Sequence, residues 1–456
     1  MVNFKQLSLD TEIPVGSLKD QYDFIFKNAA ASKLRLFSPC TINNGILTIN
    51  SISNQFLPIV EEWKDLDIFI PASGSATRLF KFVDNKKTLN DNIQKLPFFD
   101  EDNDNVELLI NKYKHKPKAI IPFHKFGDYL VTPMEEIIEF YSRIYPYSNI
   151  HFTIQDEHKD LIISKLSQSG FLKSKKIDFE DKVIFSFQRK ELNSVCFVNS
   201  EAPLKYNNRY YSHPSGHGAL IDNLSHIKRK YTYIHNIDNI SPKTQDLRVK
   251  NIDQMYKMLL FIDKNIKNLL RTLEKNNFQE AVESSFYKDF LIKYFSHLVH
   301  IDNKPINKEL LFKNLNKPVR VCGVIRDSGA KGGKPLWVYD DKSMLSLQIV
   351  EESQVNLDDS RMRDIWHDSN YFNPVEIIIS NEDYLGNKFN FNSHINKDLG
   401  MVVEKTIFNK KVLFFEKPGL WNGSMHDWIT IFVEINEKSF APVKNICDLF
   451  LPIHQP

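Results

Sequence analysis

The chain has 456 residues, which is too long for one ordinary core, so we expect two or three subdomains. Apolar residues make up 42% and charged residues 25%, the composition of an ordinary soluble globular protein. The 59 Lys and Arg residues nearly balance the 57 Asp and Glu residues, which argues against a nucleic-acid binder that works through a large basic field.

Cysteine spacing and apolar runs bear on the cellular compartment. The four cysteines are scattered without paired spacing, so they predict neither a zinc site nor a disulfide framework and fit a reducing compartment. Residues 1–16 contain acids and lack the apolar region of a signal peptide, and no apolar run is long enough to span a bilayer. We therefore expect a cytoplasmic protein with no membrane partner.

Residues 1–63 are expected to form a helical lead-in, with one helix beginning after a cap at Ser17. Residues 82–116 form a polar insertion that we expect to carry structure of its own or to act as a lid. The alternating acids at 100–104 resemble a calcium loop. Its sixth position is not Gly, however, and its twelfth is Asn111 rather than Glu, so a solvated loop or helix start is the better interpretation.

The stretch 67–81 predicts a buried strand, a loop of small residues and a helix. The loop contains Ser73, Gly74, Ser75 and Ala76, and Thr77 and Arg78 follow it. Small side chains let backbone N–H groups face an anion, and a helix N-terminus favours negative charge. The guanidinium of Arg78 has the fork geometry that suits phosphate. The stretch therefore predicts a phosphate-binding loop, with a plain surface loop rich in Ser and Ala as the alternative.

Strands and helices alternate from residue 67 to residue 239. Further strands are expected at 118–123, 149–155, 182–188, 194–198 and 231–239, and helices from Thr132, at 156–169 and at 219–229. This alternation predicts a mostly parallel sheet with both faces covered. In such sheets ligands bind beyond the carboxyl ends of the strands, where Asp238 falls in the sequence.

The second half begins with a helical pattern over 244–295. Hairpin strands are expected in 318–350 around the glycine-rich stretch 327–335, and further strands at 372–380, 412–416 and 428–435. A Walker A interpretation of Gly332-Gly-Lys334 fails because the glycine spacing is wrong and Pro335 replaces Ser or Thr. His213 and His217 are four residues apart, but the Pro-Ser-Gly between them prevents the helix that a zinc pair would need.

Short motifs in a fixed order resemble the nucleotidyltransferases that make nucleoside-diphosphate sugars, most closely the UDP-sugar pyrophosphorylase family. That family has a loop of the type G-x-G-T-R-L, a later P-K, an F-x-Q segment, a P-x-G-H/N-G turn and a V-D-N strand end. The corresponding segments here are Ser73-Gly-Ser-Ala-Thr-Arg-Leu79, Pro117-Lys118, Ser186-Phe-Gln188, Pro214-Ser-Gly-His-Gly218 and Asn236-Ile-Asp-Asn239. Later segments resemble the family's V-E-Y-S-E, G-N-I-x-x-H-F and E-F-S-P-L-K-N motifs: Leu347-Gln-Ile-Val-Glu-Glu-Ser-Gln354, Asn370-Tyr-Phe-Asn373 and Lys438-Ser-Phe-Ala-Pro-Val-Lys-Asn445.

The resemblance implies roles for particular residues. Arg78, Lys118 and Lys444 would be catalytic, acting on the phosphates of the two substrates. Asp238 would bind Mg²⁺, which needs only one or two carboxylates besides phosphates and water. Nucleotide binding would fall to residues 73–77 with Gln188 and Gly216, and sugar binding to His217, Asn236, Glu351 and Asn373. Each also has a structural alternative as a surface, strand-end or turn residue.

The sequence also departs from the family pattern. Ser73 and Ala76 replace glycines in the loop, and about forty residues separate Arg78 from Lys118 where the family has only a few. The chain therefore resembles a divergent branch of the family.

We predict an α/β fold: a three-layer, Rossmann-like (GT-A-like) nucleotidyltransferase core with a mixed, mostly parallel sheet and helical additions. The predicted parts are a lead-in at 1–63, the core at 64–310 and a C-terminal part at 311–456 that completes the sugar and phosphate site. The implied reaction joins UTP and a sugar-1-phosphate, with Mg²⁺ as cofactor and no nucleic-acid partner. Two alternatives stay open: a nucleotide-sugar-binding or regulatory protein without turnover, and a polymerising glycosyltransferase, which would need an acidic pair where Asn239 follows Asp238.

Overall fold

The computed structural model describes most of the chain. The described residues are 2–27, 33–48, 60–74, 76–80, 86–100, 102, 105–200, 202–214, 216–275, 284–301, 304–305, 307–327, 329, 332–340 and 344–456.

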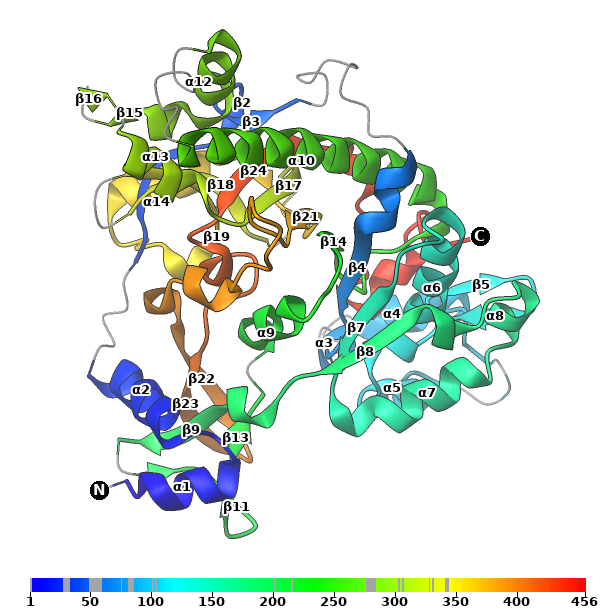
Figure 1. The fold of residues 1–456 in the computed structure, drawn as a ribbon. Helices are drawn as coiled ribbons and strands as arrows, with labels where there is room; N and C mark the ends of the chain where they lie inside the picture. The colour runs from blue at the N-terminus through cyan, green and yellow to red at the C-terminus, as the bar shows by residue number, and fades with distance from the viewer. Residues whose placement is uncertain are drawn as a thin grey trace.

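A large central sheet forms the middle layer (Figure 1). Its main path runs β2 (Thr41–Ile42), β3 (Gly45–Leu47), β24 (Ile429–Glu434), β17 (Val319–Arg326), β21 (Ile377–Ser380), β14 (Tyr231–Ile234), β4 (Leu66–Pro71), β7 (Ile150–Ile154) and β8 (Val183–Phe187). On this path only β21 is antiparallel to its neighbours, and the short β20 (Tyr371–Phe372) adds an antiparallel pair to β17. The prediction of a mixed, mostly parallel sheet is confirmed.

Both faces of this sheet are buried, and successive side chains of one strand point into two different cores because they alternate between the faces. On β4, Ile68 and Ile70 join the larger core, to which α6 (Pro133–Ile144) and α10 (Gln245–Glu274) contribute. Phe69, between them, joins a second core with α9 (Leu220–Ser225). The three-layer arrangement is therefore confirmed. Helix α6 begins after Thr132, as expected, and the structure adds a capping box between Thr132 and Glu135.

A second sheet lies apart from the central one, at the lower left of Figure 1. It contains β9 (Ser194–Asn199), β10 (Ala202–Pro203), β13 (Ser212–His213), β22 (Met401–Ile407) and β23 (Lys410–Glu416). The N-terminal helices α1 (Phe4–Thr11) and α2 (Val15–Phe26) bury Leu7, Leu18 and Ile25 against it. Helix α2 begins at Val15 with Pro14 at the N-cap, so the predicted cap at Ser17 is wrong, and Ser17 lies inside the first turn.

The lead-in is not wholly helical, because β1 (Arg35–Pro39), β2 and β3 lie within residues 1–63. Strand β1 pairs with β18 (Lys334–Tyr339), which pairs with β19 (Leu345–Val350), in a third sheet. The predicted hairpin around 327–335 is therefore wrong: β17 enters the central sheet, while β18 belongs to the third. The central sheet contains strands from before and after residue 310. The division of the chain into parts at 1–63, 64–310 and 311–456 stays a prediction.

Three other expectations need adjustment. The segment 118–123 is not a strand but the 3-10 turn η6 (Lys118–Ile120) followed by buried chain, because the apolar run reflects burial rather than strand pairing. Strand β9 lies in the second sheet rather than the parallel one, and β14 ends at Ile234 rather than at Asn239. The insertion carries helices of its own, α4 (Lys86–Asn92) and α5 (Val106–Tyr113), as expected.

Candidate active site

The ends of three parallel strands set the position of the site. Ser73 and Gly74 follow β4, Gln188 follows β8, and Asp238 lies four residues beyond β14. These strands run in the same direction, so their carboxyl ends lie on one edge of the sheet. The structure thus brings three separately predicted segments to a common edge.

Backbone hydrogen bonds hold the loop after β4 against the Lys118 segment. The Lys118 N–H donates to the Gly74 carbonyl at 3.2 Å, and the Ala76 N–H donates to the Lys116 carbonyl at 3.0 Å. The Ala76 amide is thus already paired in this arrangement. A Cβ placed on Gly74 would meet no atom within 4 Å, so the loop is open at this residue.

Gln188 links the loop to the turn that contains Gly216. Its amide nitrogen Nε2 donates to the Gly216 carbonyl at 3.0 Å and to Ser73 Oγ at 3.4 Å. Gly216 has φ +56°, a left-handed conformation that glycine adopts without a steric penalty. The two segments predicted to bind the nucleotide are therefore joined through one side chain.

Two lysines from distant parts of the chain converge on Asp238. Lys118 Nζ lies 2.7 Å from Oδ2 of Asp238, and Lys444 Nζ lies 3.2 Å from both carboxylate oxygens. Burial alone would raise the pKa of Asp238, but the two ammonium groups outweigh it and lower that pKa to about 2. Burial lowers the pKa of Lys118, although Asp238 opposes the shift. The Lys444 side chain is 54% exposed, whereas that of Lys118 is 13% exposed, so Lys444 is the lysine that faces solvent.

Asp448 is a positioning residue that the sequence interpretation missed. Its carboxylate accepts hydrogen bonds from the backbone N–H groups of Lys444 and Asn445, at 2.6 Å and 2.8 Å. Val443 N–H donates to the Asp238 carbonyl at 2.9 Å, which fixes the C-terminal segment beside the strand end. The spacing of Asn445 and Asp448 is that of a capping box and was the available signal.

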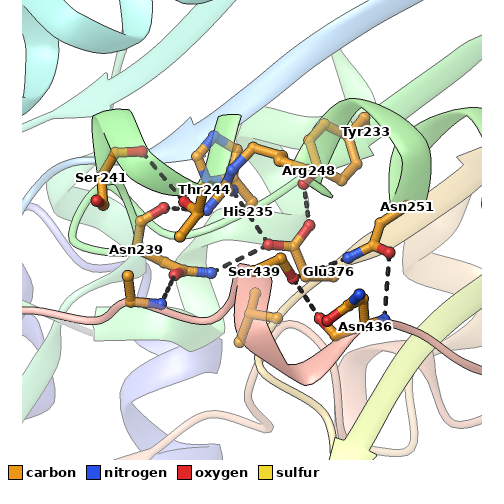
Figure 2. Close-up of polar contacts among 12 residues, drawn as sticks. Tyr233, His235, Asn239, Ser241, Thr244, Arg248, Asn251, Glu376, Asn436 and Ser439 are labelled. Carbon is orange, nitrogen blue, oxygen red and sulfur yellow. Dashed lines mark hydrogen bonds and ion pairs between the residues drawn. The ribbon is translucent and has the colours of Figure 1, made fainter. Parts of the chain in front are cut away.

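A fully buried ionic network lies beneath the strand end (Figure 2). The Glu376 carboxylate accepts hydrogen bonds from Arg248 at 3.1 Å, from Asn239 at 3.0 Å and from the Tyr233 hydroxyl. Arg248 also donates to the Asn239 carbonyl at 2.5 Å. The network therefore fixes the residue that follows Asp238. Nothing in the local sequence pattern around Glu376 marks it as the partner of Arg248.

The residues predicted to bind sugar are not all brought together. Burial raises the pKa of Glu351, a hydrogen bond from Trp421 opposes the shift, and the charge of Glu416 adds to it. Asn373 is almost fully buried, and its amide serves the backbone: Nδ2 donates to the Gly323 carbonyl at 2.6 Å and Oδ1 accepts from Val375 N–H. Asn236 is partly exposed next to the Asp238 segment.

Some predicted site residues cannot be placed. Ser75 lies outside the described residues, and so do the side chains of Thr77, Arg78 and His217. Helix α3 (Thr77–Phe80) does follow the loop, as the sequence predicts. The roles assigned to these four residues stay predictions.

The surroundings of Asp238 show how far the described residues fit Mg²⁺. Both carboxylate oxygens already accept hydrogen bonds from lysine ammonium groups. Within the part of the chain that the structure describes, no group of three His, Cys, Asp or Glu side chains is arranged to hold a metal ion. Because two ammonium groups repel a divalent cation, this arrangement does not fit a resident Mg²⁺ at Asp238. The metal role of Asp238 stays a prediction.

Comparison with solved structures identifies the class of fold. A crystal structure of a UDP-glucose pyrophosphorylase mutant from Leishmania major, in complex with UDP-glucose, aligns with a TM-score of 0.51 at 13% identity; the match covers 98% of this chain and 78% of the other. The UDP-N-acetylglucosamine pyrophosphorylase of Trypanosoma brucei, solved with an inhibitor, aligns with a TM-score of 0.45 at 11% identity, covering 95% of this chain and 74% of the other. The chain has the nucleotidyltransferase-like fold of the UDP-sugar pyrophosphorylases, as the motif order predicts.

The family itself follows from a match to a family model. Residues 105–455 match the domain of unknown function DUF4301, and the chain belongs to that family. No curated protein matches the chain. None of the helices in the described residues combines the length and apolar composition needed to cross a membrane.

Proposed function

We propose that this protein transfers a uridylyl group from UTP to a sugar-1-phosphate, giving a UDP-sugar and pyrophosphate. The observation that carries the proposal is the convergence of Lys118 and Lys444 on Asp238, beside the open loop at Gly74. The choice of chemistry comes from the order of the sequence motifs, and the fold shared with UDP-sugar pyrophosphorylases is compatible with it.

The proposed reaction needs positioning and positive charge more than covalent help. An oxygen of the sugar phosphate attacks the α-phosphorus of UTP, a new P–O bond forms, and the bond from the α-phosphorus to its bridging oxygen breaks, so that pyrophosphate leaves. Negative charge builds on phosphoryl oxygens during this step. In this proposal Lys118 and Lys444, which both pair with Asp238, stabilise that charge.

Asp238 holds the ammonium groups of both lysines in place when no phosphate is bound. A buried ammonium group is costly without a counter-charge, and Asp238 supplies one to Lys118. Phosphate oxygens offer the lysines alternative acceptors on the same edge of the sheet. Mg²⁺ would arrive with the triphosphate, and we assign it no ligand among the protein's residues.

A second candidate is a nucleotide-sugar-binding protein without turnover. It is favoured by Ser73 and Ala76 in place of loop glycines, by the paired Ala76 amide and by the pairing of both lysines with Asp238. The two functions differ in which ligand is bound best.

Isothermal titration calorimetry with UTP, UTP plus Mg²⁺, and UDP-glucose separates these functions. A transferase binds UTP in the presence of Mg²⁺ and, when a suitable sugar-1-phosphate is added, releases pyrophosphate as the UDP-sugar forms. A binding protein prefers the UDP-sugar and releases no pyrophosphate. Failure to bind any of the three ligands overturns both proposals and leaves only the fold in common.

A further inference from the structure

The side chain of Asn239 links the segment that follows strand β14 to the C-terminal segment. Its Nδ2 donates a hydrogen bond to Oε1 of Glu376 at 3.0 Å (Figure 2). On the other side, its Oδ1 accepts a hydrogen bond from the backbone N–H of Ala441 at 2.9 Å. The Asn239 backbone also forms an isolated β-bridge with Pro442. Asn239, which is almost fully buried, therefore holds the chain three residues before Lys444.

The chemistry on the two sides of Asn239 requires an amide. A backbone N–H only donates and an ionised carboxylate only accepts, so a residue between Ala441 and Glu376 must offer an acceptor to one and a donor to the other. Asparagine offers both on one short side chain. An aspartate there would place a second buried carboxylate against Glu376, whose charge Arg248 already balances. The amide of Asn239 is thus matched to both of its neighbours.

Other contacts hold the Asn239 backbone without help from its side chain. The Asn239 carbonyl accepts a hydrogen bond from Arg248 at 2.5 Å. Val443 N–H donates to the Asp238 carbonyl, a contact between two backbone groups. Loss of the Asn239 side chain therefore leaves the strand end held, but it removes the acceptor that the C-terminal segment uses. We expect the consequence to fall on the segment that carries Lys444.

A second buried asparagine holds the same segment at a point farther from Lys444. Asn251, on α10, accepts a hydrogen bond from Asn436 N–H at 3.2 Å, and its Nδ2 donates to Ser439 Oγ at 2.8 Å. Asn251 is buried to the same extent as Asn239. Its contacts end five residues before Lys444 rather than three. The two asparagines therefore allow a matched comparison of two similar amides at different distances from the lysine.

We propose that Asn239 is a positioning residue that sets Lys444 beside Asp238. Its amide is required because it accepts from Ala441 while it donates to Glu376. In this proposal the Asn239 side chain acts through Lys444 and contacts no substrate. The effect on turnover rests on the proposed function, which assigns Lys444 to the charge on the phosphates.

Hydrogen exchange tests the positioning without any ligand. Mass spectrometry follows amide exchange over residues 440–446 in the full wild-type chain, in Asn239→Ala and in Asn251→Ala. We expect exchange at Val443 to be at least about tenfold faster in Asn239→Ala, the equivalent of about one hydrogen bond, and to change by less than about twofold in Asn251→Ala. An unchanged rate at Val443 in folded Asn239→Ala, or the same acceleration in both variants, overturns the inference.

A double-mutant cycle on pyrophosphate release tests the route through the lysine. The values of kcat and KM for UTP are measured for Asn239→Ala, for Lys444→Ala and for the double variant, with Asn251→Ala as the control. Asn239→Ala should lower kcat by about tenfold in the wild-type background, but by less than about twofold where Lys444 is already replaced. Asn251→Ala should change kcat by less than about twofold. Equal factors for Asn239→Ala in both backgrounds overturn the inference, because a purely structural effect does not depend on Lys444.

A reciprocal exchange tests the amide itself and provides a second variant should Asn239→Ala fail to fold. Asn239→Asp alone should lower kcat by about tenfold, since two buried carboxylates would meet. Adding Glu376→Gln should bring kcat back to within about threefold of the wild type, because one donor–acceptor pair and one negative charge beside Arg248 return. No recovery overturns the requirement for the amide. An inactive wild type overturns the proposed function, while exchange at Val443 still decides this inference.

Discussion

The ammonium nitrogen of Lys118 lies 2.7 Å from Oδ2 of Asp238, although 120 residues separate the two in the chain. The contact joins the segment held by the Gly74 loop to the segment that follows strand β14. Lys444 completes the group from the C-terminal segment. Three segments far apart in the sequence thus supply one cluster, in which two lysines pair with an aspartate. The cluster lies at the edge of the sheet where α/β proteins bind ligands.

Lys118→Ala should lower the rate of pyrophosphate release by about 10²- to 10³-fold, the usual cost of removing one preorganised donor to transition-state charge. Lys125→Ala, at an exposed position seven residues on, should keep the wild-type rate. Both variants should keep the wild-type circular dichroism spectrum. A Lys118→Ala variant with a near-normal rate would remove this lysine from the chemistry.

Gly74→Val should weaken UTP binding by about tenfold or more, because the added side chain extends into open space where the loop would face phosphate. The free energy of unfolding should change by no more than about 0.5 kcal/mol, since no atom stands in the way. Gly16→Ala, likewise uncrowded but on α2, is the control. Calorimetry and urea unfolding measure the two quantities, and unchanged UTP affinity in Gly74→Val would count against the phosphate loop.

Glu376→Gln should lower the free energy of unfolding by about 3–5 kcal/mol, because it leaves the buried guanidinium of Arg248 without a counter-charge. Glu139→Gln breaks the more exposed pair with Arg143 and should cost no more than about 1 kcal/mol. Urea denaturation of both variants provides the comparison. Equal effects would show that the network in Figure 2 does not support the strand end.

Acidification should weaken the docking of the C-terminal segment. His454 Nδ1 lies 3.0 Å from Nε2 of His124. The other ring nitrogen of His124, Nδ1, lies 2.6 Å from Oε2 of Glu136, and all three side chains are buried. Burial, and then the charge of His124, lower the pKa of His454 to about 4 from its ordinary 6.5. The unfolded chain binds a proton at His454 more readily than the folded chain does, so protonation favours unfolding. The stability contributed by neutral His454 is therefore complete above about pH 6.5 and is lost as the pH falls towards 4.

His454→Asn should therefore flatten the pH dependence of stability between pH 6.5 and 4, by up to about 1.4 kcal/mol per pH unit. Urea unfolding at several pH values measures this slope for both proteins. His367→Asn is the control, because that histidine is exposed on helix α14 (Ser360–Asp368), away from His454. The same slope in His454→Asn and the wild type would contradict this role of His454.

The parts of the fold that the sequence predicts well are those with strong local signals. The run Ile68–Ile70, the capping box at Thr132 and the long helical pattern after Thr244 all appear as expected elements. The segment after Lys118 was mistaken for a strand because burial without pairing gives the same apolar run. The hairpin around 327–335 failed because a glycine-rich connection does not reveal whether its flanking strands pair with each other.

The candidate site divides in the same way. Motif order placed Lys118, Asp238 and Lys444 in one prediction, and the structure brings their charged groups together. Asn373 was assigned to sugar binding from a short motif, yet its amide is engaged by the backbone. Glu376 escaped notice because its importance comes from Arg248, which lies 128 residues away on another element.

The most direct test of the proposed activity is pyrophosphate release from UTP and Mg²⁺, measured with a panel of sugar-1-phosphates and with ATP, GTP and CTP as nucleotide controls. The account predicts release that depends on UTP and on one of the sugar-1-phosphates, and that falls by about 10²- to 10³-fold in Lys118→Ala. If folded protein that binds a UDP-sugar released no pyrophosphate with any sugar-1-phosphate of the panel, the result would contradict the transferase proposal and favour a binding protein.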